Sequence, residues 1–232
     1  MKKRVVILSG AGMSAESGIS TFRDSGGLWD KYPIEQVATP EAWQANPELV
    51  LEFYNIRRKE LLGVKPNAGH IGLAELEADF DVQIITQNVD NLHEQAGSTN
   101  VLHLHGELMK VRSVGDESDI IELDASCPEI FIGDVCEKGF QLRPHIVWFG
   151  EAVPLIEEAA RLTETADIFV VIGTSLNVYP AAGLLRYAPK GIPIYLIDPN
   201  DVPVSRGGVH FIKKGASEGV KELKELLLKG VN

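Results

Sequence analysis

The sequence predicts an α/β protein, in which a Rossmann-like, doubly wound parallel sheet is joined to a smaller domain. Three observations support this fold class. A short apolar run, Val5 to Leu8, leads directly into a glycine-rich turn at residues 10–12. Strand-like and helix-like segments alternate over most of the chain, as parallel sheets with crossover helices require. Two stretches interrupt this alternation, one helical and one rich in turns, and they would form the smaller domain.

The composition predicts a folded protein and argues against several classes of partner. The chain has 232 residues, of which 44% are hydrophobic, enough for a substantial core. A formal net charge of −11 disfavours binding to nucleic acid or to an anionic membrane. No apolar segment approaches the roughly 20 residues needed to span a bilayer. The two cysteines, Cys127 and Cys136, do not define a disulfide-rich scaffold, so we expect a cytoplasmic protein.

The turn after the first strand has the pattern G-x-G-x-x-A, with Gly10, Gly12 and Ala15 at the defined positions. Glycines let the backbone approach a pyrophosphate, and free N–H groups at the start of the following helix stabilise the anion. We therefore expect a dinucleotide-binding turn. A strand-turn-helix unit that binds nothing fits the same pattern.

Residues 31–79 read as helices, where a typical Rossmann unit would already have its second strand. Thr39 can cap a helix that starts at the next residue, Pro47 can open a helix over 47–62, and Asn67 precedes a third over 68–80. This stretch is the expected helical insertion.

The next predicted strand, Val82 to Thr86, ends in the amides Gln87 and Asn88. A dehydrogenase of this fold would carry an acidic residue at that position, so the amides weaken a hydride-transfer interpretation. A further short strand, Val101 to Leu104, stops at His105 and Gly106. Residues 107–143 then become acidic and rich in turns, as in a small separate module.

Alternation resumes toward the C-terminus. We expect strands over 145–149, 167–172 and 193–197, with helices over 155–165 and 181–187. A last helix is expected to be capped by Ser217 and to stop at Gly230, with Val220, Leu223, Leu226 and Leu227 on one face. The predicted main domain comprises residues 1–30, 80–106 and 144–232, and the smaller domain comprises 31–79 and 107–143.

Five segments resemble the successive signature blocks of the sirtuins, the NAD-dependent protein-lysine deacylases: GAGMSAESGISTFR (10–23), TQNVDNLHEQAG (86–97), HLHGEL (103–108), RPHIVWFGE (143–151) and GTSLNVYPAAG (173–183). They occur in the family's order and span most of the chain. The resemblance implies a Rossmann-like domain with a smaller domain built from a helical insertion and a zinc-ribbon-like module. It also implies a reaction in which NAD is consumed: an acyl-lysine amide oxygen attacks the ribose carbon that bears nicotinamide, and the acyl group ends on ADP-ribose.

The resemblance assigns roles to individual residues. His105 would be the general base, since imidazole titrates near neutrality, and Asn88 would help to orient the reacting ribose. The loop Phe149, Gly150 and Glu151 would bind acyl-lysine proteins as extended peptides by strand addition. The remaining NAD contacts would come from Gly10, Ala11, Gly12, Ser14, Ala15, Thr21, Phe22, Arg23, Trp29, Gln87, Asn88, Asp90, Gly173, Thr174, Ser175, Asp198 and Ala216.

Tyr54 and Arg57 lie three residues apart on a predicted helix and so share one face. The segment resembles the Y-x-x-R of the sirtuin subgroup that removes succinyl and malonyl groups, in which the guanidinium grips the acyl carboxylate. Ala38 fits the small residue that makes room for the longer chain. The resemblance therefore implies a bacterial deacylase that prefers acidic acyl groups and also acts on acetyl-lysine. A solvated helix face is the alternative on spacing alone.

The family normally carries four cysteines in its module, which bind a structural zinc ion. Here Ser113 stands where the first cysteine is expected, and only Cys127 and Cys136 remain. We therefore expect a module without zinc. Its expected apolar contacts come from Ile120, Ile121, Leu123, Ile130 and Phe131.

Two other classes of function remain open from the sequence. An ADP-ribosyltransferase or NAD glycohydrolase would use the same cleavage of NAD with another acceptor. A non-catalytic sensor of NAD or ADP-ribose would use the binding site alone, although the presence of both His105 and Asn88 argues against it.

Overall fold

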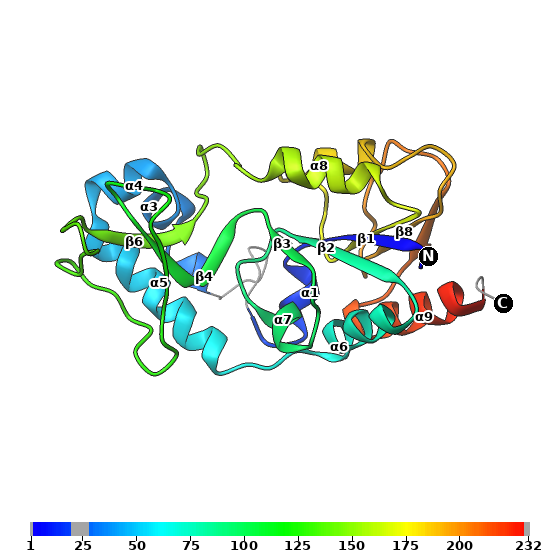
Figure 1. The fold of residues 1–232 in the computed structure, drawn as a ribbon, viewed down its shortest axis with the longest axis horizontal. Coiled ribbons are helices and arrows are strands. Elements are labelled where there is room, and N and C mark those ends of the chain that lie inside the picture. Colours follow the sequence, from blue (N-terminus) through cyan, green and yellow to red (C-terminus); the bar gives the residue numbers. More distant parts are fainter. Residues whose placement is uncertain (1, 20–27, 230–232) are drawn as a thin grey trace.

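The computed structural model of the chain describes residues 2–19 and 28–229. Its main sheet has six parallel strands in the order β3-β2-β1-β7-β8-β9 (Figure 1). The strands are β1 (Arg4–Ser9), β2 (Asp81–Thr86), β3 (Val101–His103), β7 (Ile168–Ile172), β8 (Ile194–Ile197) and β9 (Val209–Ile212). Successive strands extend from β1 in both directions, which confirms the doubly wound fold. The edge strand β9 was not predicted, because His210 and Phe211 in its middle are exposed.

Helices cover both faces of this sheet because residues along β1 point alternately to opposite sides. Val5 and Ile7 pack with α6 (Ala68–Glu75) and α9 (Ala216–Lys229), which lie below the sheet in Figure 1. Val6 and Leu8 pack on the other face, with α8 (Ile156–Glu164). All four β1 side chains are fully buried. The apolar run of the sequence is therefore a central strand covered on both faces.

The helical insertion forms as the capping residues predict. Thr39 Oγ1 accepts the Ala42 N–H at the start of α4 (Pro40–Ala45), over 3.0 Å. Asn46 Oδ1 likewise accepts the Leu49 N–H, 3.1 Å away, at the start of α5 (Pro47–Leu62). The insertion also contains α2 (Leu28–Lys31) and α3 (Ile34–Val37). The third predicted helix is shorter than expected, because α6 ends at Glu75 and continues only as the 3₁₀ turn η1 (Leu76–Ala78).

A second, antiparallel sheet lies beside the insertion, with the order β5-β4-β6. Its strands are β4 (Gly106–Ser113), β5 (Ile120–Glu122) and β6 (Leu142–Ile146). The expected return to the main sheet at 145–149 was wrong, because β6 pairs with β4. Ile130 is buried in this module, and Ile121 and Leu123 pack against its core. Ile120 and Phe131 do not contribute as expected, since they are 45% and 57% exposed.

Two details near the C-terminus differ from the predictions. The segment expected to be helical at 181–187 is the 3₁₀ helix η2 (Ala181–Arg186). Ser217 is not a cap, because α9 already begins at Ala216. The Ser217 N–H instead donates to the Glu16 carboxylate, 3.3 Å away. The predicted stop at Gly230 lies outside the described residues. In the described ranges, no helix has both the length and the apolar character needed to cross a membrane.

Candidate functional site

The carboxyl ends of β1 and β7 meet at the point where the sheet reverses direction, which is where ligands bind in this class of fold. Gly10, Gly12 and Gly173 make the closest contacts there. The Gly10 N–H donates to the Ile172 carbonyl over 3.0 Å, and the Gly12 N–H donates to the Gly173 carbonyl over 2.8 Å. A Cβ on Gly12 would lie 2.8 Å from Gly173 Cα. The two turns are therefore locked together through backbone contacts.

These bonds correct one expectation about the turn. The N–H groups of Gly10 and Gly12 are not free for a pyrophosphate, because they already bond to the turn after β7. Those of Met13 and Ser14 donate to carbonyls within the same turn. The helix that follows, α1 (Gly12–Ala15), is only four residues long. The glycines thus shape the backbone at this edge, while their N–H groups hold the two turns together.

A methyl group at Gly12 would test this contact. We expect Gly12→Ala to lower the stability of the fold by about 1–3 kcal/mol, because the new Cβ meets rigid backbone. NAD should also bind more weakly. Gly183→Ala is the matched control, since a Cβ there meets nothing within 4 Å. Thermal unfolding and calorimetric titration with NAD measure both effects, and equal stabilities of the two variants would contradict the contact.

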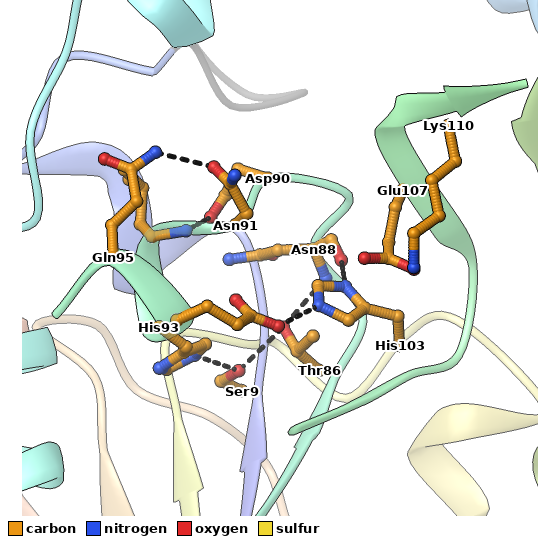
Figure 2. Close-up of polar contacts among 12 residues, drawn as sticks. Ser9, Thr86, Asn88, Asp90, Asn91, His93, Gln95, His103, Glu107 and Lys110 are labelled. Atoms are coloured by element: carbon orange, nitrogen blue, oxygen red, sulfur yellow. Dashed lines mark hydrogen bonds and ion pairs between the residues drawn. The ribbon is translucent and has the colours of Figure 1, made fainter. Parts of the chain in front are cut away.

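A polar network occupies the end of β2 beside this turn (Figure 2). Asn88 Nδ2 donates to the Gly10 carbonyl and to Ser14 Oγ, each over 3.1 Å. Ser14 Oγ donates in turn to Asp90 Oδ2, 2.9 Å away. Burial raises the pKa of Asp90. The hydrogen bonds that it accepts from Leu92 and Ser14 lower this pKa, but they offset the effect of burial only in part. The network joins predicted site residues from both strand ends. Asp90 also accepts the N–H of Leu92, the first residue of α7 (Leu92–Gln95), whose N-cap residue is Asn91.

Two histidines beneath this network were not predicted. His93 Nε2 lies 3.0 Å from Ser9 Oγ, and Ser9 Oγ lies 2.9 Å from Thr86 Oγ1. The His70 ring packs edge-on against the His93 ring, with centroids 4.9 Å apart. Burial lowers the pKa of His70 to about 4 and the pKa of His93 well below its usual value. Both rings are therefore neutral at pH 7. For His70, its place within an apolar helical stretch was the available sequence signal.

His105 is the group best suited to proton transfer. Its Nδ1 lies 3.0 Å from the Gln87 carbonyl, which only accepts, so the ring proton sits on Nδ1. The lone pair is then on Nε2. Burial lowers the pKa of His105, and the bond to Gln87 only partly offsets this. The ring is thus a neutral base at physiological pH. The next residue, Gly106, has a φ of +80°, and a Cβ there would lie 2.0 Å from the His145 carbonyl oxygen.

Other predicted NAD contacts lie at neighbouring strand ends. Gln87 Nε2 donates to Thr174 Oγ1 over 3.2 Å, which joins the ends of β2 and β7. Ser175 follows Thr174 directly and is partly exposed. Asp198, after β8, is buried, and its carboxylate accepts the Asn200 N–H over 2.8 Å. Ala216 is buried at the start of α9. The predicted residues Thr21, Phe22 and Arg23 lie outside the described residues.

The residues predicted to bind the acyl chain, Ala38, Tyr54 and Arg57, lie together in the insertion. Tyr54 and Ala38 are buried in one apolar cluster with Trp148. The Phe149 N–H donates to the Ala38 carbonyl over 3.0 Å, and Trp148 Nε1 donates to the Tyr54 hydroxyl over 3.1 Å. Because indole only donates, the Tyr54 oxygen accepts this bond, and the hydroxyl donates no hydrogen bond to another described side chain. Val147, earlier in the same segment, donates its N–H to the His105 carbonyl, so this region adjoins the base.

Arg57 is a half-buried cation among aromatic rings. Its guanidinium carbon lies 5.1 Å from the centroid of Trp29, 5.8 Å from Phe53 and 5.9 Å from Tyr54. Burial lowers the pKa of Arg57. No acidic side chain in the described ranges forms an ion pair with it. The structure places Trp29, predicted as an NAD contact, against Arg57 and Phe53.

Glu151 holds the predicted peptide loop in place. Its carboxylate accepts hydrogen bonds from Arg143 Nη1 at 2.9 Å and from the Trp148 N–H at 2.7 Å. Arg143 also stacks on the Trp148 ring, 3.5 Å from the centroid. The turn residue Gly150 has a φ of +91°. The Glu151 side chain therefore fixes the loop that is predicted to bind peptides by strand addition.

The module offers poor ligands for the zinc ion that the fold implies. The buried Cys136 thiol lies 3.4 Å from Ser113 Oγ, and Cys127 is exposed. A hydroxyl in place of a thiolate removes one of four ligands. Among the described residues, one group has the spacing of metal ligands, Glu94, His103 and Glu107, and it lies outside the module's cysteine region.

The fold and this site define a Rossmann-like protein that binds a dinucleotide beside a neutral histidine base. A model of the Sir2 family matches residues 10–180. A protein from Bacteroides thetaiotaomicron named NAD-dependent protein deacylase is 64% identical over 231 residues, covering 97% of this chain and 98% of the relative. The chain therefore belongs to the Sir2 family.

Solved structures show the same relationship. A complex of a Sir2 homologue with NAD is 40% identical and superposes with a TM-score of 0.88, covering all of this chain and 91% of the other. A Sir2 variant with a deacetylated p53 peptide and 3′-O-acetyl ADP ribose is 30% identical, with a TM-score of 0.78 and coverage of 97% and 94%. The predicted family is thus confirmed from sequence and from structure.

Proposed function

We propose that this protein is an NAD-dependent protein-lysine deacylase, which consumes NAD and releases nicotinamide and O-acyl-ADP-ribose. The observation that carries the proposal is the neutral His105 ring, whose Nε2 lone pair lies on the same strand-end edge as the Asn88 network. The relative from Bacteroides carries the deacylase name, and the NAD complex of a Sir2 homologue shares the fold. NAD is then a substrate of the protein.

We propose a separate role in this reaction for each group of site residues. In the proposed reaction, nicotinamide leaves the ribose carbon and the acyl-lysine amide oxygen attacks it. His105 Nε2 accepts a proton from a ribose hydroxyl, which activates that oxygen to receive the acyl group. Asn88 and Asp90, fixed through Ser14, would hold the nicotinamide ribose. The 149–150 backbone would bind the acyl-lysine protein as an added strand. We propose that residues 31–79 and 107–143 form the smaller domain, and that residues 1–30, 80–106 and 144–232 form the main domain.

Within this activity we propose a preference for succinyl and malonyl groups. Arg57 is a partly buried cation that forms no ion pair with the described residues, although the charges of Asp90 and Glu60 act on it, and a negatively charged acyl chain would pair with it directly. The Tyr54 hydroxyl would add a second donor. Ala38 is buried in the same cluster and leaves more room than a larger side chain would.

One assay tests the function and its alternatives. The protein is incubated with NAD and matched peptides that carry acetyl-, malonyl- or succinyl-lysine, and nicotinamide and peptide products are quantified. A deacylase releases nicotinamide only with an acylated peptide, in equal amounts with the deacylated product. An NAD glycohydrolase would release it with no peptide present, and a sensor would release none.

We also propose that the module contains no structural zinc. The Cys136 contact to Ser113 and the exposure of Cys127 support this. Elemental analysis of the purified protein is expected to find well under one zinc ion per chain, and a chelator should leave the melting temperature unchanged. One tightly bound zinc per chain, together with destabilisation by the chelator, would contradict the proposal.

A further inference from the structure

His103 is held differently from its neighbour His105, although the two share the H-L-H-G segment. Its Nδ1 lies 3.1 Å from the Asn88 carbonyl, and its Nε2 lies 2.7 Å from a carboxylate oxygen of Glu94. Both partners are acceptors only, so each ring nitrogen must carry a hydrogen. The contacts thus require His103 to be an imidazolium, while His105 is neutral. His103 is also 92% buried, since its relative exposure is 8%.

The His103 and His105 rings donate hydrogen bonds to consecutive backbone carbonyls of one turn. His105 donates to the carbonyl of Gln87. His103 donates to that of Asn88, as Figure 2 shows. The Asn88 N–H is fixed as well, because it donates to Thr86 Oγ1 over 3.0 Å. With its backbone held on both sides, Asn88 directs its side chain to Gly10 and Ser14. A loss of the His103 bond would free one of these restraints.

We propose that the His103–Glu94 ion pair is a positioning device that holds Asn88 for the reaction, and that loss of its proton sets the alkaline limit of activity. This inference rests on the proposed deacylase function. His103 acts through Asn88 and is therefore a positioning residue. Glu94 in turn keeps the ring charged and oriented.

The charges around His103 favour this protonation state. Glu94 and the neutral His93 face it from α7, Glu107 and Lys110 face it from β4, and Asp90 faces it from the loop after β2. Lys110 is itself paired with Glu107 over 2.6 Å. Burial lowers the pKa of His103, but the hydrogen bond and charge of Glu94, with a contribution from Glu107, raise it above the ordinary value. Burial raises the pKa of Glu94, but the hydrogen bond and charge of His103, a backbone hydrogen bond and the charge of Lys110 together lower it below the ordinary value.

The sign of the pH effect follows from these directions. His103 remains charged at neutral pH and loses its proton as the pH rises through its raised pKa. Activity that depends on the charged form is full below that pKa and falls above it. His105 has a lowered pKa and is the base, so its protonation limits activity on the acid side. The two histidines would thus set opposite limbs of one bell-shaped profile.

Three variants test the device through the pH dependence of kcat/KM for NAD at saturating acyl-peptide. Glu94→Gln should move the alkaline limb down by about one pH unit, because it removes the opposite charge. His103→Asn keeps a donor near Nδ1 but cannot titrate, so it should remove that limb. His103→Leu loses the donor and should lower kcat/KM for NAD about tenfold, with KM for the peptide unchanged. Glu157→Gln, 85% exposed on α8, is the matched control.

A titration of the histidine rings by NMR gives a readout that does not need turnover. The His103 signal should titrate above pH 6.5 in the wild type and lower in Glu94→Gln. Superimposable pH profiles for wild type, Glu94→Gln and His103→Asn would overturn the proposal, and so would a His103 pKa at or below 6.5. Activity that disappears on chelation and returns with Zn²⁺ would also overturn it, since a metal on Nε2 excludes the proton. Absence of any deacylation by the wild type would instead refute the proposed function.

Discussion

His105→Asn is expected to lower kcat for deacylation by about 10²- to 10⁴-fold, the usual contribution of a positioned general base. Asparagine has an amide N–H that can still donate to the Gln87 carbonyl, so the turn should keep its shape. It has no basic nitrogen to accept a ribose proton. Chromatographic measurement of nicotinamide and deacylated peptide would give kcat, and NAD binding by calorimetry should remain within a few-fold of wild type.

The control for this variant is His210→Asn, because His210 is an exposed histidine on the edge strand β9. It should keep wild-type activity. In the wild type, the acid limb of the rate profile should have its midpoint below pH 6.5, since burial lowers the pKa of His105. Near-normal kcat in His105→Asn would remove this residue from the chemistry.

Arg57→Met is expected to reverse the acyl preference. A charged hydrogen bond contributes about 1.5–3 kcal/mol, so kcat/KM for succinyl-lysine peptide should fall about 10- to 150-fold. Activity on acetyl-lysine should change less than about threefold, because an acetyl group has no carboxylate. Arg57→Lys keeps the charge but loses the planar, forked guanidinium, so its preference for succinyl-lysine should lie between those of the wild type and Arg57→Met. The ratio of kcat/KM for paired succinyl and acetyl peptides measures the effect.

Removal of a positive charge elsewhere provides the comparison for Arg57→Met. Arg161→Met suits this purpose, since the Arg161 side chain is 70% exposed on α8. Its selectivity should match the wild type. An unchanged ratio of kcat/KM for succinyl and acetyl peptides in Arg57→Met would show that the guanidinium does not recognise the acyl chain, even if overall activity fell.

The sequence predicted the main strands and helix starts because their signals are local. The apolar run of β1, the caps Thr39 and Asn67, and the polar ends of β2 and β7 each depend on neighbouring residues. β6 was misplaced because a short strand in isolation does not reveal its pairing partner. β9 was missed because edge strands require little apolar sequence.

The candidate site was likewise predicted where its signals are local and missed where they depend on tertiary packing. Sequence blocks pointed to His105, Asn88 and Gly173, and the structure brings Asn88 and Gly173 to the glycine turn, with His105 joined to the same turn through Gln87. The blocks did not reveal that the glycine N–H groups are already bonded, because that depends on the register of β1 with β7. The His70 and His93 pair depends on how α6 packs against α7. Only tertiary packing determines such contacts.

The glycine contact between the β1 and β7 turns also restricts how the protein can evolve. A side chain at Gly12 would collide with the backbone of Gly173, so relief would have to come from Gly173, whereas a side chain at Gly10 would also meet the Thr174 side chain. Gly173 cannot provide it, because it has no side chain to shorten and its φ of +63° already disfavours any other residue. A Cβ at Gly173 would in turn lie 2.3 Å from the Met13 nitrogen. No single compensating substitution is therefore open for Gly12, and Gly12 and Gly173 are expected to persist together through descent.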